Sequence, residues 1–430
     1  MTVSSALSSR PPSKDIDDSV AVAAGSILDR ETFIGIRRRM ALEACKWDPQ
    51  VEDVSVLQPF PLLLRRAQWR YLAACAEALA RETGAAERAL LERPDLLSKL
   101  AVPPRLAQPI LRGLRSPQPL AAEARVMRFD FHPAQNGWCI SEVNSDVPGG
   151  FSEASEFPSM MAEHYPGYAP AGAPGPDLAN ALARTIEHIG GRQASAALIW
   201  AAGFMEDLQV VSYLGGLLRR CGIETSLINP QHLRFDRGRA SLIAAGGCQP
   251  LSLIVRFHQA EWLSRRGYAA VGSYLLGDSE TPVINPGYAM LSESKRFPLV
   301  WDDLRMEMRT WRQLLPETRD PREVRWRRDA RWLLKTAFCN TGDSVSSPLT
   351  MPRRNWFRSA ADATVFPNRW VAQRRFESLT IDTPLGPVYP CIGVYTIGGR
   401  ACGIYGRLSR TPVVTYAAAD VAVLVEEEFE

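Results

Sequence analysis

The clearest alternation of apolar and polar residues lies in "RVMRFDFHPAQNGWCISEVNSD", residues 125 to 146. Period-two alternation is typical of a half-buried strand, and it runs on both sides of Asn136 and Gly137. An Asn-Gly pair between two alternating segments is a strong signal for a tight hairpin turn. The pattern therefore predicts two antiparallel strands joined at this turn.

Four polar residues of this hairpin carry its candidate chemistry. Arg128 and Asp130 share one face of the first strand, and Glu142 and Asn144 share one face of the second. Carboxylate and amide oxygens are hard ligands that suit Mg²⁺, while an arginine suits a phosphate or a carboxylate. An ordinary solvated sheet face would show the same pattern. The following "SDVPGG", residues 145 to 150, predicts a turn-rich loop that could wrap a substrate.

Elsewhere in the first half of the chain the hydrophobic period is helical. Residues 31 to 115 fit this period, most clearly in "PLLLRRAQWRYLAACAEALARETG", residues 61 to 84. The Pro- and Gly-rich stretch 155 to 180 predicts a loop. Residues 1 to 30, rich in Ser, Ala and Pro without an apolar signal core, predict a mobile tail.

Residues 195 to 289 predict a separate parallel α/β unit. Three apolar strands are expected in "SAALIWAAG", "IETSLIN" and "PLSLIVRF", with an amphipathic helix in "DLQVVSYLGGLLRRCG". The unit contains neither GxGxxG nor GxxxxGK[ST], so neither a dinucleotide site nor a P-loop is supported there.

Residues 290 to 430 predict an α+β region. We expect a helix in "SESKRFPLVWDDLRMEMRTW", strands in "RWLLKTAF" and "RWVAQRRF", and a hairpin around Gly398 and Gly399. The fold class predicted for the chain is thus mixed α+β and α/β, divided into a tail (1–30), a helical region with the polar hairpin (31–194), the parallel unit (195–289) and this last region.

Composition narrows the classes of partner. A net charge of +3 over 430 residues does not suggest nucleic acid. "RWRRDARW" (325–332) and "MPRRNWFR" (351–358) alternate arginine with tryptophan and could stack on bases, although a solvated face explains them as well. No apolar run approaches the roughly 20 residues of a membrane helix. The eight cysteines are scattered without CxxC, which favours a reducing cytoplasm.

Lysine is rare in this chain. Only 5 of the 50 basic residues are lysines, and Lys335 closes the predicted strand 331–338 just before a Gly-containing turn. Lysine and arginine are not interchangeable, because a compact ammonium on a flexible stem reaches individual phosphate oxygens. Lys335 and Lys295 are therefore candidate phosphate ligands. A snorkelling strand-end lysine and an ordinary surface charge are the alternatives.

The order of these motifs resembles the glutathionylspermidine synthase family, over most of residues 31 to 430. The resemblance is carried by "RFDFHPAQNGWCISEVNSD", "INPGYAMLSESKRFPLVWDDL", "WLLKTAFCNTGDSV", "WVAQRRF" and "PCIGVYTIGGRACGIYGRLS". It implies an ATP-grasp fold with an inserted pre-ATP-grasp unit, and it covers the synthetase domain without the family's amidase domain.

Carried over position by position, the resemblance implies a role for eleven residues. The Mg²⁺ ligands would be Asp130, Glu142 and Asn144, with two ions expected, and the pair holding the transferring phosphoryl group would be Arg128 and Arg407. The nucleotide would be held by Lys295, Lys335, Thr341, Gly342, Gln373 and Phe376.

The implied activity is an ATP-dependent carboxylate–amine ligase that works through an acyl phosphate and releases ADP. Its substrates would be a small carboxylate and an amine, drawn from amino acids, peptides or polyamines, and a homodimer is compatible with the family. No Ser-His-Asp or Cys-His grouping is apparent, which agrees with chemistry that needs no covalent nucleophile. An ATPase or phosphotransferase, or a non-catalytic nucleotide-binding protein on the same fold, is the alternative.

Overall fold

The computed structural model describes residues 22–47, 50–51, 54–116, 118–189, 194–244, 246–268, 270–338, 345–415 and 417–428. Its largest sheet is antiparallel, in the order β21-β20-β19-β5-β6, and β18 pairs with β19. The strands are β5 (Val126–Ala134), β6 (Gly137–Asn144), β18 (Ile381–Thr383), β19 (Gly386–Ile397), β20 (Arg400–Ser409) and β21 (Ala419–Val421). Both predicted hairpins are confirmed, and the pairing of β5 with β19 joins them in one sheet.

The predicted parallel unit is also confirmed. Its sheet has the order β14-β13-β8-β9, with all strands parallel. These strands are β8 (Ser195–Trp200), β9 (Glu224–Ile228), β13 (Leu253–Phe257) and β14 (Val283–Ile284), and α7 (Met205–Arg220) connects the first two. A small antiparallel sheet, which the hydrophobic pattern did not predict, projects beside it: β10 (Leu233–Asp236), β11 (Arg239–Ala244) and β12 (Gly247–Pro250).

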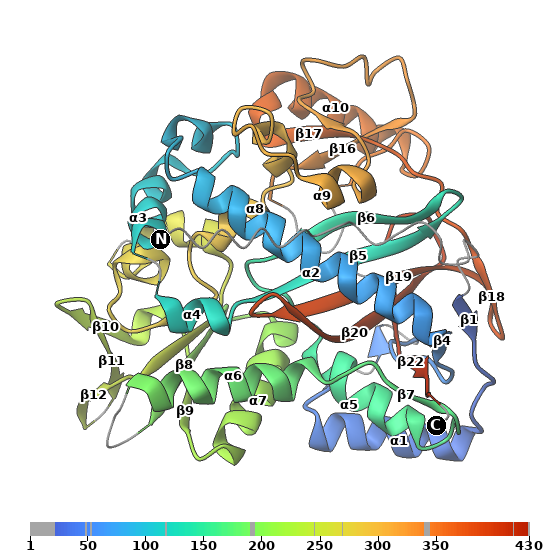
Figure 1. The fold of residues 1–430 in the computed structure, drawn as a ribbon, viewed down its shortest axis with the longest axis horizontal. Coiled ribbons are helices and arrows are strands. Elements are labelled where there is room, and N and C mark those ends of the chain that lie inside the picture. The colour runs from blue at the N-terminus through green and yellow to red at the C-terminus, as the bar shows by residue number, and fades with distance from the viewer. Residues whose placement is uncertain are drawn as a thin grey trace, which may run out of the picture.

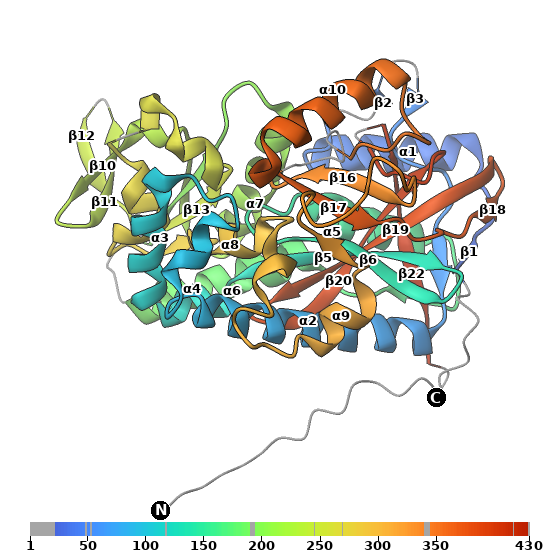
Figure 2. The same ribbon diagram turned by 90° about the horizontal axis from the view of Figure 1, so that it is seen from above.

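A third unit consists of a three-stranded sheet covered on one face by a helix. The strand order is β15-β17-β16, comprising β15 (Thr318–Arg319), β16 (Trp332–Thr336) and β17 (Trp370–Arg374). Helix α10 (Arg353–Val365) lies over β16 and β17 (Figure 2). Alternation sends Trp332 and Trp370 into a small core beneath α10, whereas Lys335 and Gln373 face the opposite side.

The remaining strands bring the two ends of the described chain together. The sheet order is β1-β4-β22-β7, with β1 (Val22–Ala24), β4 (Leu62–Leu64), β7 (Tyr168–Pro170) and β22 (Val423–Glu426). Strand β1 comes from within the predicted tail, whose residues 1–21 lie outside the described part. A two-stranded ribbon, β2 (Gln50–Val51) with β3 (Val54–Ser55), completes the strands that the structure describes.

Helix α2 (Arg66–Ala89) crosses one face of the main sheet (Figure 1). Its buried Leu72, Cys75 and Leu79 belong to the core cluster that also contains Phe129 and Ile392 of that sheet. The other α-helices are α1 (Arg30–Glu43), α3 (Pro104–Arg115), α4 (Pro119–Glu123), α5 (Phe151–Ala162), α6 (Pro174–Ile189), α8 (Ala289–Glu293) and α9 (Arg309–Leu314). Across the described ranges, no helix is long and apolar enough to cross a membrane.

Three local predictions were wrong. Residues 155–180 are not a loop, because most of them belong to α5, β7 and α6. The predicted helix 61–84 begins as strand β4, and helix starts only at Arg66. The predicted helix 292–311 is broken: α8 ends at Glu293, a 3₁₀ turn covers Phe297–Val300, and α9 starts at Arg309. Pro298 limits the preceding residue to extended or turn backbone, which disfavours one continuous helix.

Candidate active site

The β5–β6 hairpin forms the floor of the candidate site. Arg128 is paired with Asn144 and Asp130 with Glu142, so the four polar side chains share one face as predicted. The register then skips Ser141, which gives β6 one additional residue at that point. An additional residue in one strand is a β-bulge, a device that re-aims local groups and is common beside functional sites.

Asp130 is the centre of the polar face. Its carboxylate is 1% exposed and accepts hydrogen bonds from Arg128 Nε at 2.8 Å, Arg407 Nη2 at 2.7 Å and Asn144 Nδ2 at 3.1 Å. Arg407 comes from β20, so three strands meet on this one side chain. Gly393 of β19 allows the approach, since a Cβ there would lie only 2.8 Å from Arg128 Cδ.

The cations around Asp130 control its protonation. Burial by itself would raise the pKa of Asp130, but the charges of Arg128 and then Arg407 outweigh it and lower that pKa. Burial also lowers the pKa of the neighbouring His132 to about 4, so this histidine is neutral at pH 7. The carboxylate is therefore a permanent anion beneath two permanent cations.

Both predicted lysines reach strand β6 where it lies opposite Asp130. Lys335, from β16, donates to the carbonyl oxygen of the bulged Ser141 at 3.0 Å. Lys295, just after α8, lies 3.4 Å from Glu142 Oε2 and 3.5 Å from Glu293 Oε1. Burial disfavours the charge of Glu142, yet Lys295 and Lys335 together lower its pKa. Both lysine side chains are buried. They are therefore neither the surface charge nor the snorkelling strand-end lysine that were the alternatives.

These lysines line a narrow cleft between the hairpin and the β15–β17–β16 sheet. The residues around it are Ser141, Glu142, Val143, Ser292, Glu293, Ser294, Lys295, Phe297, Pro298, Trp311, Leu315, Lys335 and Gln373. Gln373, predicted to bind the nucleotide, donates from Nε2 to Thr318 Oγ1 at 2.9 Å. Phe376 lies farther along the chain against His132, with 5.3 Å between ring centroids, and does not line this cleft. The predicted Thr341 and Gly342 lie outside the described residues.

The predicted magnesium ligands fit the ion through their chemistry. In the described ranges, no three His, Cys, Asp or Glu side chains are grouped to hold a metal. Mg²⁺ seldom needs such a group, because it keeps several waters and binds through one or two carboxylates plus substrate phosphates. Asp130 and Glu142 supply two carboxylates, and Asn144, whose Nδ2 donates to Asp130, has its amide oxygen as a further hard donor.

A chain of buried polar residues behind the two arginines was missed from the sequence. The Tyr405 ring lies between them, with centroid distances of 5.1 Å to Arg128 and 5.5 Å to Arg407. Its hydroxyl donates to Asp420 at 2.6 Å, and Asp420 pairs with Lys46 at 3.1 Å. Lys46 also pairs with Glu153 of α5 at 2.7 Å. The signal that could have pointed to this cluster was Lys46 itself, one of the five lysines.

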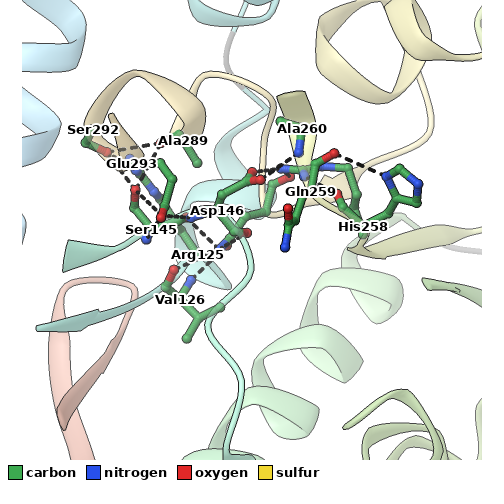
Figure 3. A network of polar contacts seen from close by, with 12 residues as sticks. Arg125, Val126, Ser145, Asp146, His258, Gln259, Ala260, Ala289, Ser292 and Glu293 are labelled. Carbon is green, nitrogen blue, oxygen red and sulfur yellow. Dashed lines mark hydrogen bonds and ion pairs between the residues drawn. The ribbon is translucent and has the colours of Figure 1, made fainter. Parts of the chain in front are cut away.

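A second network anchors the loop that follows Asn144 (Figure 3). Asp146 is buried, pairs with the fully buried Arg256 and accepts from Ala260 N at 2.8 Å. The Glu293 carboxylate accepts from the backbone N–H groups of Ser145 and Asp146 at 2.7 and 3.1 Å. The loop is thus tied to the parallel unit and to α8. That this loop wraps a substrate stays a prediction.

Comparison with solved structures concerns the fold. A glutathione synthetase-like effector from Globodera pallida, solved in its apo form, superposes with a TM-score of 0.60. The match covers 92% of this chain and 97% of that one at 12% sequence identity, and it shows a shared fold. A protein assigned as a γ-glutamylcysteine synthetase from Methylobacillus flagellatus has a TM-score of 0.42 at 12% identity, over 80% and 88% of the two chains. The first of these matches and the mixed parallel and antiparallel sheets confirm the mixed α/β, ATP-grasp-like fold class predicted from the sequence.

The family follows from the sequence comparison. The glutathionylspermidine synthase preATP-grasp family model matches residues 62–426. The chain therefore belongs to this family, as its motifs indicated, and membership supports a ligase role. No curated protein sequence matches it.

Proposed function

We propose that this protein is an ATP-dependent carboxylate–amine ligase that forms an amide bond through an acyl phosphate and releases ADP. The observation that supports it most is the convergence of Arg128, Arg407, Lys295 and Lys335 on one buried face that offers Asp130 and Glu142 as counter-charges. With Glu293, which lies 3.5 Å from Lys295, four cations face three carboxylates. This leaves a surplus of positive charge that a polyphosphate would neutralise.

Each side chain has a distinct task in this proposal. Lys295 and Lys335 bind phosphate oxygens of ATP in the cleft, while Arg128 and Arg407 stabilise the charge on the phosphoryl group in transfer. Asp130, Glu142 and Asn144 would hold magnesium, which when bound supplies neutralisation of the phosphate oxygens. Gln373, on the wall of the same cleft, contacts the nucleotide.

The reaction has two steps. A substrate carboxylate oxygen attacks the γ-phosphorus and ADP leaves; the amine nitrogen then attacks the acyl carbon and phosphate leaves. The protein itself forms no covalent bond, so its contribution is positioning and stabilisation of charge. Substrates of the proposed class are an amino acid, peptide or polyamine.

The test is ADP release with ATP and Mg²⁺ across a panel of carboxylates and amines, for wild type and Asp130→Ala. Release that requires one particular pair, and is lost in Asp130→Ala, supports the ligase. Release without any amine would indicate an ATPase or phosphotransferase instead. If no pair stimulates release and Asp130→Ala binds Mg·ATP as tightly as wild type, the assignment of this face is wrong.

A further inference from the structure

The Arg–Trp alternation in residues 325–332 separates into two faces. Trp326 and Trp332 are buried with Trp370 in the core beneath α10, so they cannot stack on a nucleobase. The arginines between them point outward, and the Arg327 guanidinium lies 4.8 Å from the centroid of the Trp326 ring. The tryptophans therefore form a scaffold, and the arginines are what this segment presents to ligands.

The arginines line a cavity of about 550 Å³ between this segment and the end of α10. That volume lies within the range of small-molecule sites, roughly 300–1,000 Å³. Its lining is Pro321, Arg322, Val324, Arg325, Trp326, Arg327, Arg328, Ala363, Thr364 and Pro367. Four guanidinium groups contribute and no carboxylate does.

Little of this charge is balanced locally. Arg322 pairs with Asp320 at 2.8 Å, but Asp320 is shared with the buried Arg296 at 2.7 Å. Arg327 donates to the neutral hydroxyl of Thr364. Within the described ranges, neither Arg325 nor Arg328 has an ion-pair partner. Like charges held around one cavity repel each other, and an anion bound among them would remove that repulsion.

The segment is held in place before any ligand arrives. Trp326 Nε1 donates to the Pro321 carbonyl at 3.0 Å, and Arg328 N donates to the Arg325 carbonyl at 2.9 Å, which closes a turn. A preorganised site loses less conformational entropy when it binds. The guanidinium plane also matches phosphate and carboxylate oxygens two at a time.

We propose that this cavity is a binding site for a compact polyanion carrying several phosphate or carboxylate groups. The site is separate from the candidate active site. Trp326 and Ala363, which line the cavity, share the core beneath α10 with Trp332 and Trp370. That core lies on the opposite face of the β15–β17–β16 sheet from Lys335 and Gln373. The proposal does not depend on the ligase reaction.

The experiment is isothermal titration of the full chain with inorganic tripolyphosphate in EDTA at low ionic strength. Because this probe also suits the active-site cations, Lys295→Ala/Lys335→Ala serves as the background that isolates the cavity. On that background, Arg325→Gln/Arg328→Gln should weaken binding about tenfold or more, since it removes two charge-assisted contacts. The matched control is Arg319→Gln/Arg331→Gln, two exposed arginines of the same unit that pair with Glu317 and Asp329.

The control should leave affinity within twofold, and added salt should weaken binding to the parent. A parallel titration with citrate separates the two sources of the charge: binding of tripolyphosphate alone assigns a phosphate-bearing ligand, and comparable binding of citrate a polycarboxylate. Equal affinity in the parent and in Arg325→Gln/Arg328→Gln would overturn the proposal. So would an equal loss in the control, or the absence of binding by both probes.

Discussion

Two buried charge networks lie side by side at the end of the β5–β6 hairpin, and they are built differently. Around Asp130, two arginines share one carboxylate. On the neighbouring strand, Lys295 lies beside Glu142 and Lys335 bonds to the Ser141 carbonyl. Around Asp146, one arginine meets one carboxylate, and backbone groups bond to both side chains. With Glu293 counted, the first network has four cations and three carboxylates, whereas the Arg256–Asp146 pair at the centre of the second is balanced.

This difference separates a site from a scaffold. A buried charge is costly unless it is paired, so a balanced ion pair is complete without a ligand. A network with surplus cations is complete only when an anion joins it. The Asp130 face therefore favours a polyphosphate ligand, and the Asp146 network holds the loop and Glu293 in position for it.

The largest expected effect is on the stability provided by the Arg256–Asp146 pair. Arg256→Met would leave Asp146 buried without its cation, and we expect the free energy of unfolding to fall by about 3–5 kcal/mol. Urea unfolding followed by circular dichroism measures it. Arg112→Met is the matched control, because Arg112 forms an equally close pair with Asp278 at an exposed position and should cost less than about 1 kcal/mol. Equal losses of stability in the two variants would contradict a special structural role for the buried pair.

Substitutions in the candidate active site should reduce turnover and leave the stability of the fold unchanged. Lys335→Ala should reduce kcat/KM for ATP by about 10²–10³, since it removes a buried ammonium aimed at the cleft. Lys335→Arg should recover little of it, because a planar guanidinium is a poor substitute there. Lys99→Ala, an exposed lysine paired with Asp303, is the control and should retain full activity. Unchanged kinetics in Lys335→Ala would remove this lysine from the site.

The third effect depends on pH. Burial, followed by the charge of Asp146, raises the pKa of Glu261 to about 7 from a usual value of 4.5. Between pH 4.5 and 7 the folded state therefore holds a proton that the unfolded state has released, so this group lowers stability as pH rises, levelling off above pH 7. Thermal unfolding of Glu261→Gln against wild type should show a stabilisation that grows over this window to about 1–2 kcal/mol. A difference that is independent of pH would contradict the assignment.

The smallest effect concerns the residue between the two arginines. Tyr405→Phe keeps the ring against Arg128 and Arg407 but loses the hydrogen bond to Asp420. One such bond is worth about 1 kcal/mol, so a three- to tenfold fall in kcat is expected, with KM for ATP nearly unchanged. Tyr405→Leu, which also removes the aromatic face, should lose more. If both variants lose the same, the hydroxyl rather than the ring positions the arginines.

The sequence predicted the site better than it predicted the connecting helices. Period-two alternation and an Asn-Gly turn determine a hairpin locally, so the faces of Arg128, Asp130, Glu142 and Asn144 were correct. The scarcity of lysine directed attention to Lys295 and Lys335, which do meet at this hairpin. These signals are local, and they survive folding because the hairpin forms from neighbouring residues.

Long-range pairing was not predictable in the same way. The 155–180 stretch contains helices because its Ala, Met and Leu side chains find a core, although its Pro and Gly content indicated a loop. Nothing near Asp146 in the sequence indicates that Arg256 is its partner, and nothing near Asp420 indicates Lys46. Such pairs depend on the packing of separate units, which no local period encodes.

The bulge at Ser141 has one further consequence. Its carbonyl holds the Lys335 ammonium, and so the hairpin and the β15–β17–β16 sheet are latched together by one of the groups proposed to bind the nucleotide. An arriving anion would exchange this bond to a neutral carbonyl oxygen for a bond between opposite charges. The same lysine thus joins the two units and lines the cleft between them.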